Sequence, residues 1–315
     1  MSLTAKFIIF QAMIIVPFIL GSLLKGHFSN QTGFTKKLVR INLIFIEPLI
    51  VFWSIWGISL KSNLVFLPVF GLAFVLTGMA IGKIFIPVLG ISDKKKATFL
   101  ISSSLANHGF TMGGFLCYLL MGEQGLGLSF IFVSYFMPYI ILVIFPYASL
   151  VSRPARYDRR FVVEFFSNIQ NMPLYVFFFA LALHGCGFKR PNIFFPIDLL
   201  LMLAIALYHF TLGINFEFKE VLSSRKENMA LGLIKFFIIP MITFLVLRLV
   251  AFDPQMKAVI MLESFMPVAV YSVMVPVLYD LDAKLASSLF VVNTLIFLII
   301  VLPIVFLFGK SLLGI

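Results

Sequence analysis

Charged residues are scarce in this 315-residue chain, of which only 12% is Asp, Glu, Lys or Arg. In contrast, 61% of the residues are hydrophobic, 39 are Phe, and the mean hydropathy is +1.09. A soluble globule of this size needs far more polar side chains to cover its surface. The composition therefore excludes a soluble protein and indicates an integral membrane protein whose surroundings are a lipid bilayer.

Enzyme motifs and long hydrophilic segments are also missing. The chain has no GxSxG, HExxH or P-loop pattern and no paired-carboxylate spacing, so we expect no enzymatic activity. The two cysteines, Cys117 and Cys186, lack metal-ligand spacing, and we expect both to pack as small hydrophobic residues. We expect no cofactor, and no metal beyond a coupling sodium ion.

Acidic residues are few, 13 against 24 Lys and Arg, which gives a net charge of +11. In a soluble protein this excess would suggest nucleic acid. Here the basic residues stand between apolar runs, so we expect no nucleic acid partner and interpret the charges as signals of membrane orientation.

Ten apolar runs are long enough to cross a hydrocarbon core of about 30 Å, which takes about 20 helical residues. The chain is therefore predicted to be an all-α polytopic membrane protein with ten transmembrane helices. The predicted spans are residues 6–25, 39–58, 64–86, 97–120, 126–150, 169–188, 194–214, 228–250, 256–278 and 285–309.

The loops between these spans differ in positive charge. Loops on one side of the membrane carry 16 Lys and Arg, and those on the other side carry 7. Short cytoplasmic loops attract the positive excess, so the 16-charge side is predicted to be cytoplasmic and both termini extracytoplasmic. The expected location is the plasma membrane or a bacterial inner membrane.

The chain also resembles two copies of one unit. An offset of 161 residues aligns Lys96–Ala97 with Lys257–Ala258 and divides the ten spans into five and five. Because five is odd, the second unit enters the membrane from the opposite side, as in an inverted repeat. We predict a first repeat over residues 1–150, a short cytoplasmic connection over 151–168, and a second repeat over 169–315.

Spans 4 and 9 are interrupted at matching places. In span 4, residues 103–114 hold Ser, Asn, His and several Gly, and in span 9, Glu263 and Pro267 stand near mid-membrane. Irregular backbone survives at that depth only where protein or a water-filled cavity satisfies it, as it does in transporters. We therefore expect a midplane binding site whose half-helix N-termini offer unpaired N–H groups to an anion. The candidate substrate-binding residues are Asn107, His108, Gly109, Gly113, Pro267, Val268, Tyr271 and Ser272.

Two acids and one lysine lie deep inside spans, where charge is expensive and functional by default. Glu263 is nine residues past Pro254, about 13 Å deep at 1.5 Å per residue, and is a candidate for carrying a coupling cation or proton. Glu47 is a second candidate, or a structural carboxyl beside Pro48. Lys235 either attracts an anionic substrate or pairs with one of these two acids.

The ordered set of motifs resembles the auxin efflux carrier family of PIN-like permeases. The resemblance rests on Pro267–Ser272, Leu285–Ser288 and Leu302–Pro303 near the end of the chain and on Asn107–Phe110 in span 4. It implies crossing broken helices 4 and 9, a mobile unit that rocks against a scaffold, a homodimer, and organic anions such as dicarboxylates or indole-3-acetate as substrates. The chain departs from the family by having Gly113–Gly114 where a proline is usual.

More distantly, the chain resembles the bile acid sodium symporter family, whose sodium sites combine a helix 9 Glu with helix 4 Ser and Asn and helix 5 hydroxyls. The matching residues here are Glu263, Ser103, Asn107, Ser129 and Ser134. The sequence leaves open coupling to sodium, to protons or to neither. It also leaves open a bile acid symporter-like carrier, an anion channel and a ligand sensor that does not transport, although the repeat favours a carrier.

Overall fold

The fold is that of a computed structural model, which describes residues 3–58, 62–109, 112–152, 169, 172–214 and 224–313. Its first half is a series of helices joined by short turns. They are α1 (Leu3–Leu24), α2 (Gln31–Ile41), α3 (Glu47–Trp56), α4 (Phe66–Leu89), α5 (Asp93–Ser104), α6 (Gly113–Val133), α7 (Phe136–Tyr139) and α8 (Phe145–Ser152).

The second half is also helical and contains the same kind of interruption. Its helices are α10 (Met172–Gly185), α11 (Ile197–Ile214), α12 (Arg225–Leu233), α13 (Ile239–Leu249), α14 (Pro254–Ser264), α15 (Tyr271–Leu278), α16 (Ala283–Ile296) and α17 (Leu302–Leu313). The all-helical prediction is confirmed. Most of the predicted connection 151–168 lies outside the described residues.

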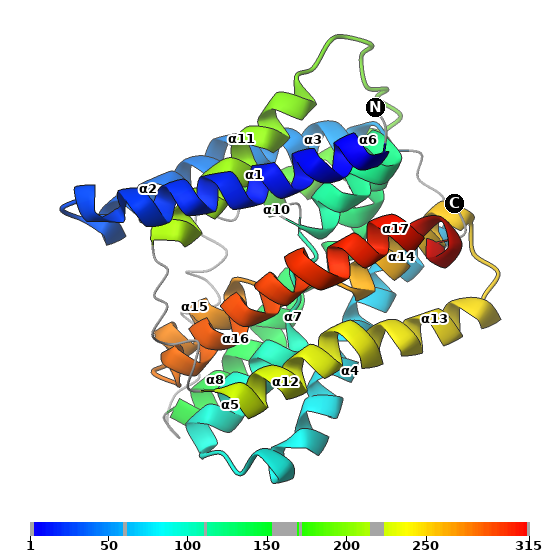
Figure 1. The fold of residues 1–315 in the computed structure, drawn as a ribbon. Helices are drawn as coiled ribbons and strands as arrows, with labels where there is room; N and C mark the ends of the chain where they lie inside the picture. The colour runs from blue at the N-terminus through cyan, green and yellow to red at the C-terminus, as the bar shows by residue number, and fades with distance from the viewer. Residues whose placement is uncertain are drawn as a thin grey trace.

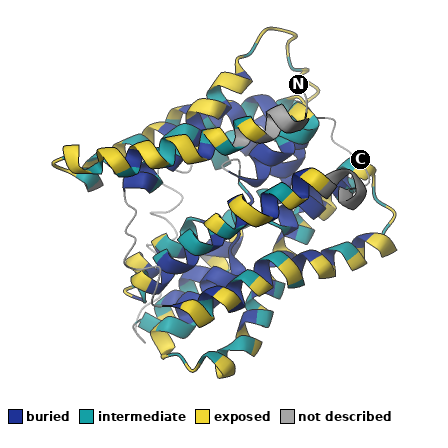
Figure 2. Cartoon of the chain, viewed as in Figure 1, coloured by how far each residue is buried: buried dark blue, intermediate teal, exposed yellow. Residues whose placement is uncertain are grey.

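Membrane-spanning character is plain in these helices. Among the described residues, six continuous helices are long and apolar enough to cross a bilayer, from Gly33–Trp56 to Ala283–Leu307. Large apolar side chains face outward on them, including Ile84, Val88, Leu249 and Leu307, each more than 70% exposed. Figure 2 shows such exposed positions on the outer helix faces and the buried ones facing inward. The protein is a multi-pass membrane protein.

The predicted boundary between spans 4 and 5, residues 121–125, falls at a kink within α6. Gly122 breaks the helix there with φ 68° and ψ −158°. A straight helix of residues 113–121 is about 13 Å long, so the part before the kink is a half-helix, whereas the part after it, to Ser152, is long enough to cross a bilayer core. Glycine tolerates this φ without steric cost.

In the part of the chain that the structure describes, four π-helical segments interrupt the long helices, and each ends two residues before a proline. They are Asn42–Ile46, Ile140–Ile144, Ile234–Ile238 and Phe297–Val301, followed by Pro48, Pro146, Pro240 and Pro303. Proline has no N–H and its ring crowds the preceding turn, so the wider π-turn relieves the clash and leaves a carbonyl to find another donor. Gln11 Nε2 donates to such a carbonyl, that of Leu298, at 2.7 Å.

The helices form two bundles (Figure 1). The first bundle contains α1, α2, α3, α10 and α11, in which α1 packs most extensively on α11 and α3 on α10. Gly21 and Gly213 let α1 and α11 approach closely, because a Cβ at either would overlap a backbone carbonyl of the other helix. The second bundle contains α4–α8 and α12–α17. The bundles meet mainly where α3 contacts α6 and α1 contacts α17.

Candidate functional site

The interruptions of the two broken helices lie against each other inside the second bundle. α5 ends at Ser104 and α14 at Ser264, and the unwound residues after them form an antiparallel bridge between Ala106 and Val268. The Asn107 N–H donates to the Pro267 carbonyl at 2.7 Å, and the Ala269 N–H donates to the Leu105 carbonyl at 3.3 Å. Each break thus replaces part of the hydrogen bonding that the other has lost, which is what irregular backbone at membrane depth requires.

Two side chains from neighbouring helices make further hydrogen bonds to the main chain of the two breaks. The ammonium of Lys235, 1% exposed, donates to the carbonyls of Ser104 at 3.2 Å and Leu105 at 3.1 Å, so it neutralises the negative end of α5. Asn293, from α16, accepts the Val268 N–H at 2.9 Å through Oδ1. The expected pairing of Lys235 with Glu47 or Glu263 is wrong, because the lysine binds main-chain carbonyls instead.

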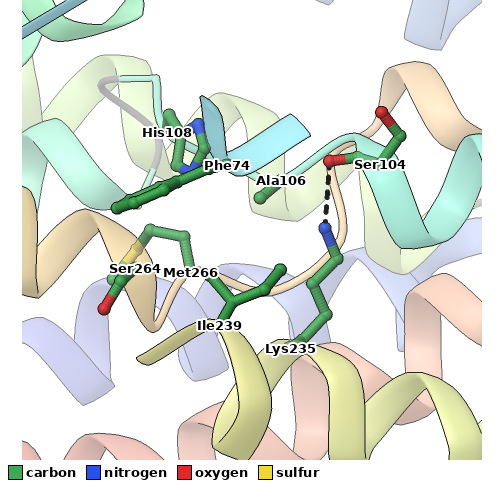
Figure 3. Close-up of a pocket in the computed structure, with 8 residues that line it drawn as sticks. All are labelled: Phe74, Ser104, Ala106, His108, Lys235, Ile239, Ser264 and Met266. Carbon is green, nitrogen blue, oxygen red and sulfur yellow. Dashed lines mark hydrogen bonds between the residues drawn. The ribbon is translucent and has the colours of Figure 1, made fainter. Parts of the chain in front are cut away.

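A small cavity of about 10 Å³ lies beside Lys235, between the two breaks, and could hold about one water molecule. Figure 3 shows the lysine rising from its helix toward the Ser104 carbonyl, with the rings of His108 and Phe74 on the other side. The lining residues are Phe74, Ser104, Ala106, His108, Lys235, Ile239, Ser264 and Met266. The cavity is therefore bordered by residues of both breaks.

His108 lies within the first break and is held by aromatic neighbours. Its ring contacts those of Phe74, Phe132 and Tyr135, and its Nδ1 lies 2.6 Å from the Tyr135 hydroxyl. The side chain is 1% exposed. These contacts fix the ring against α4 and α6, so His108 helps to shape the first break and lines the cavity.

Glu263, the last acid of α14, is completely buried. Its Oε1 accepts a short hydrogen bond of 2.5 Å from the Ser129 hydroxyl, and the Ser129 oxygen is also 3.5 Å from the His108 carbonyl. Oε2 has no hydrogen-bond partner among the described residues and presses against Gly113, where a Cβ would overlap the carboxyl group. Glu263, Ser129 and Gly113 are therefore brought together as one acidic site.

Gly113 was predicted to let backbone approach a ligand, and in this structure its missing side chain makes room for the Glu263 carboxyl instead. Gly109 is different, since a Cβ there would meet nothing within 4 Å. Pro267 and Val268 contribute the main-chain groups already described. Ser272 is buried, and its hydroxyl has no partner among the described residues.

Two of the other predicted coupling residues, Ser103 and Glu47, make their hydrogen bonds away from Glu263. The Ser103 hydroxyl donates to the Leu100 carbonyl of its own helix at 3.0 Å, and its side chain faces Gly82 of α4. Glu47 is in the first bundle, where the Tyr208 hydroxyl of α11 donates to it at 3.4 Å. Asn107 belongs to the crossover, the place where the two unwound segments meet, because its N–H donates to the Pro267 carbonyl.

The half-helix N-termini are less available than expected. In α6, the Gly113 N–H donates to the Asn107 carbonyl at 3.2 Å and the Gly114 N–H to the Gly109 carbonyl at 3.1 Å. In α15, the Ser272 N–H donates to the Ala269 carbonyl at 3.0 Å. The prediction of unpaired N–H groups is wrong for these three amides, so an anion here would rely on side-chain donors and on the helix dipoles.

Sequence reasoning missed Asn293 and Tyr135 as members of the site. Each is a polar residue in an otherwise apolar run, which is the signal that could have identified them. Cys117 is buried as predicted, whereas Cys186 is exposed after α10, so its expected packing as a small hydrophobic residue is wrong.

In this multi-pass bundle, two broken helices supply each other's missing main-chain hydrogen bonds. Membrane carriers build their binding sites from broken helices of this kind. A family model described as "Membrane transport protein" matches residues 2–305, so the chain belongs to this transporter family, which includes the auxin efflux carriers and is not an enzyme family. The chain is also similar to the uncharacterized transporter MJ1031 of Methanocaldococcus jannaschii. The two are 25% identical over 304 residues, 92% of this chain and 97% of the relative. The predicted family resemblance is confirmed.

Proposed function

We propose that this transporter is a secondary carrier of small organic anions that works by alternating access. The observation that carries the proposal is the meeting of the two unwound segments, seen in the Asn107 N–H to Pro267 carbonyl bond and the Ala106–Val268 bridge. A crossing of this kind places a ligand between two rigid half-helices, so a small rotation can change the side from which it is reached. We further propose ten spans arranged as a five-plus-five inverted repeat, with the crossing in spans 4 and 9.

The proposed anion site lies on the crossover, where positive partial charges gather. α6 and α15 begin there and direct their positive dipole ends toward it, and the buried ammonium of Lys235 adds a full charge next to the first break. The unpartnered Ser272 hydroxyl is a donor within the same region. This set suits a carboxylate, and dicarboxylates or auxin-like carboxylates are the substrates we propose.

Glu263 is the proposed coupling residue. An ionised carboxylate without a positive partner is costly in a buried site, so it is expected to bind a proton or a cation. Glu263 Oε1 and Oε2, the Ser129 hydroxyl and the His108 carbonyl are all oxygen ligands, the type that sodium and other hard cations prefer. The donor set therefore fits either a proton or sodium. A role for Glu47 would instead involve the Tyr208 hydroxyl of α11, which donates to its carboxyl.

The orientation and assembly are also proposals. The excess of positive charge in one set of loops supports a cytoplasmic placement of that set, with both termini extracytoplasmic. The family resemblance supports a homodimer.

Proteoliposomes containing the purified protein would test the transport proposal. Uptake of labelled malate, malonate, indole-3-acetate and a bile acid would be measured under imposed sodium or pH gradients. We expect saturable uptake and counterflow of at least one organic anion. Unsaturable conductance would favour a channel instead, and binding without flux would favour a sensor. Preference for the bile acid with sodium would favour the symporter-like alternative.

For coupling, we predict that Glu263→Gln keeps anion counterflow but loses the acceleration of uptake by a cation gradient. The amide keeps an acceptor for Ser129 while removing the ionisable group, so the fold is expected to persist. Ser103→Ala, which removes a hydroxyl bonded within its own helix, is the control. If uptake by Glu263→Gln still follows the gradient as in the unchanged protein, the coupling role is wrong.

A further inference from the structure

A polar cluster joins the two bundles at one end of the molecule. Arg190, in the connection between α10 and α11, donates from Nη1 to Glu123 Oε2 of α6 at 2.7 Å and to the Trp53 carbonyl of α3 at 3.1 Å. Its guanidinium also stacks over the Trp53 ring at 4.6 Å. The arginine is therefore fixed to the first bundle through Trp53 and reaches across the boundary to Glu123 of the second.

Local structure prepares both partners of this contact. A Cβ at Gly57, just after α3, would overlap the Arg190 guanidinium, so the glycine leaves the space that the arginine fills. The Trp53 ring is itself stacked on Phe195 at 4.4 Å, which holds the platform under Arg190. Glu123 directly follows the bend at Gly122, so its position depends on the turn that divides α6.

A second hydrogen bond crosses the same boundary nearby in the chain. The Tyr118 hydroxyl of α6 donates to Asp198 Oδ1 in the first turn of α11 at 2.5 Å. Tyr118 and Glu123 lie on the two sides of Gly122, and Arg190 and Asp198 flank residues 191–197. The bend of α6 is thus held at two points by one short stretch of the first bundle.

We propose that the Glu123–Arg190 and Tyr118–Asp198 contacts form a latch that closes this end of the carrier. In Figure 1 the α10–α11 connection is at the same end as both termini, so the latch would close the side predicted to be extracytoplasmic. Beneath it, α6 packs on α3, where a Cβ at Gly127 would be 3.3 Å from the Ser54 carbonyl. Opening on this side requires α6 to leave α3, and both contacts oppose that movement.

The strength of the contacts suits a reversible latch. The side chains of Arg190 and Glu123 are 27% and 40% exposed, so water screens their attraction and can replace it when the bundles separate. A fully buried pair would resist opening far more strongly, because separation would leave an uncompensated charge. The latch rests on the proposed alternating access, but it can be tested without any substrate.

The first test measures solvent access to the α3–α6 contact. Ser54, 2% exposed, would be changed to Cys in a background with Cys117→Ala and Cys186→Ser, and labelled with a membrane-impermeant maleimide added from the side of the termini. We expect Arg190→Gln and Glu123→Gln to raise the labelling rate about fivefold, in keeping with the loss of one partly exposed charge pair. Lys94→Gln, which breaks the exposed Lys94–Asp280 pair within the second bundle, is expected to leave the rate unchanged.

Charge exchange distinguishes the latch from a general loosening of the fold. The double variant Glu123→Arg with Arg190→Glu restores an opposite-charge pair and is expected to bring the labelling rate back toward that of the unchanged latch. A rate unchanged in both single variants, or raised as much by Lys94→Gln, would overturn the proposal.

A covalent version of the latch gives the opposite result. Cysteines at Tyr118 and Asp198, in the same cysteine-free background, would be cross-linked by a short bifunctional thiol reagent that a reductant cleaves. We expect the cross-link to suppress labelling of Ser54→Cys at least fivefold and cleavage to restore it. Labelling that proceeds unchanged in the cross-linked protein would show that this end opens without separating the two contacts, against the proposal.

Discussion

The break between α5 and α6 and the break between α14 and α15 lie against each other, but their incoming half-helices end differently. The last carbonyls of α5 accept hydrogen bonds from the Lys235 ammonium of a neighbouring helix. In α14, the carbonyls of Leu262 and Glu263 accept the N–H groups of Phe265 and Met266 in a tightened last turn. The first break therefore depends on a charge brought from elsewhere, whereas the second closes locally and carries a buried acid of its own.

The ammonium of Lys235 and the carboxyl of Glu263 both come from the second half of the chain. The offset of 161 residues pairs Lys235 with Phe74 and Glu263 with Ser102, so both ionisable groups come from the second half. At the matching places the first half supplies a ring packed on His108 and a small hydroxyl. The backbone crossing is shared by both halves, while the charges belong to one. The main chain of both halves can therefore form a rigid crossing, while the second half alone supplies the ammonium and the carboxyl.

The largest expected effect comes from removing the charge at the first break. Lys235→Met keeps the apolar stem but removes the ammonium donor of the Ser104 carbonyl and one of the two donors of the Leu105 carbonyl, which keeps the Ala269 N–H. Because a buried acceptor that loses its partner costs about 1–3 kcal/mol and the lost donor is charged, we expect the free energy of unfolding to fall by about 3 kcal/mol and anion uptake to be lost. Detergent-induced unfolding in mixed micelles and uptake in proteoliposomes would measure the two effects.

Lys226→Met is the matched control, because Lys226 is exposed one helix segment earlier along the same span. It should change stability by less than about 0.5 kcal/mol. Equal stability of the two variants would show that the ammonium does not support the first break. Normal uptake by Lys235→Met would remove its proposed attraction for the anion.

Much of this arrangement was predictable from residue order, and the limits have physical causes. Polar residues, Gly and Pro at mid-span identified both breaks, and the depth of Glu263 identified the acid. The direction of a side chain near the end of a half-helix depends on rotational phase, which an apolar sequence does not reveal. Ser103 was for this reason grouped with Glu263, although it faces α4. Likewise, the family resemblance locates the crossover but not the carbonyls that Lys235 binds.

An intermediate effect is expected in α6, the helix that follows the first break, where Gly113 lies against the Glu263 carboxyl. Gly113→Ala would place a Cβ onto the Glu263 carboxyl, whereas Gly109→Ala would place one in open space. Forcing a methyl group into a packed site typically costs 1–3 kcal/mol, so we expect Gly113→Ala to lose about 2 kcal/mol of stability and Gly109→Ala less than about 0.5. The same unfolding measurement would compare them.

The variants Gly113→Ala and Gly109→Ala also test ligand binding, because the sequence predicted that the backbone at both glycines approaches a ligand. If Gly109→Ala weakens anion binding at unchanged stability, that interpretation holds for Gly109 alone. Equal losses of stability in both variants would mean that the carboxyl does not occupy the space beside Gly113.

The smallest expected effects separate two serines that the sequence placed in one cation site. Ser129→Ala removes the hydroxyl that donates to Glu263, a hydrogen bond whose net contribution to stability is about 0.5–1.5 kcal/mol. Ser103→Ala removes a hydroxyl bonded to Leu100 within its own helix, so it should cost less than about 0.5 kcal/mol. We expect Ser129→Ala to shift the cation concentration for half-maximal uptake at least threefold and Ser103→Ala to leave it unchanged, because only Ser129 contacts the acid of the second break. A shift with Ser103→Ala instead would show that α5 turns toward Glu263 during transport, and the two breaks would then share one cation site.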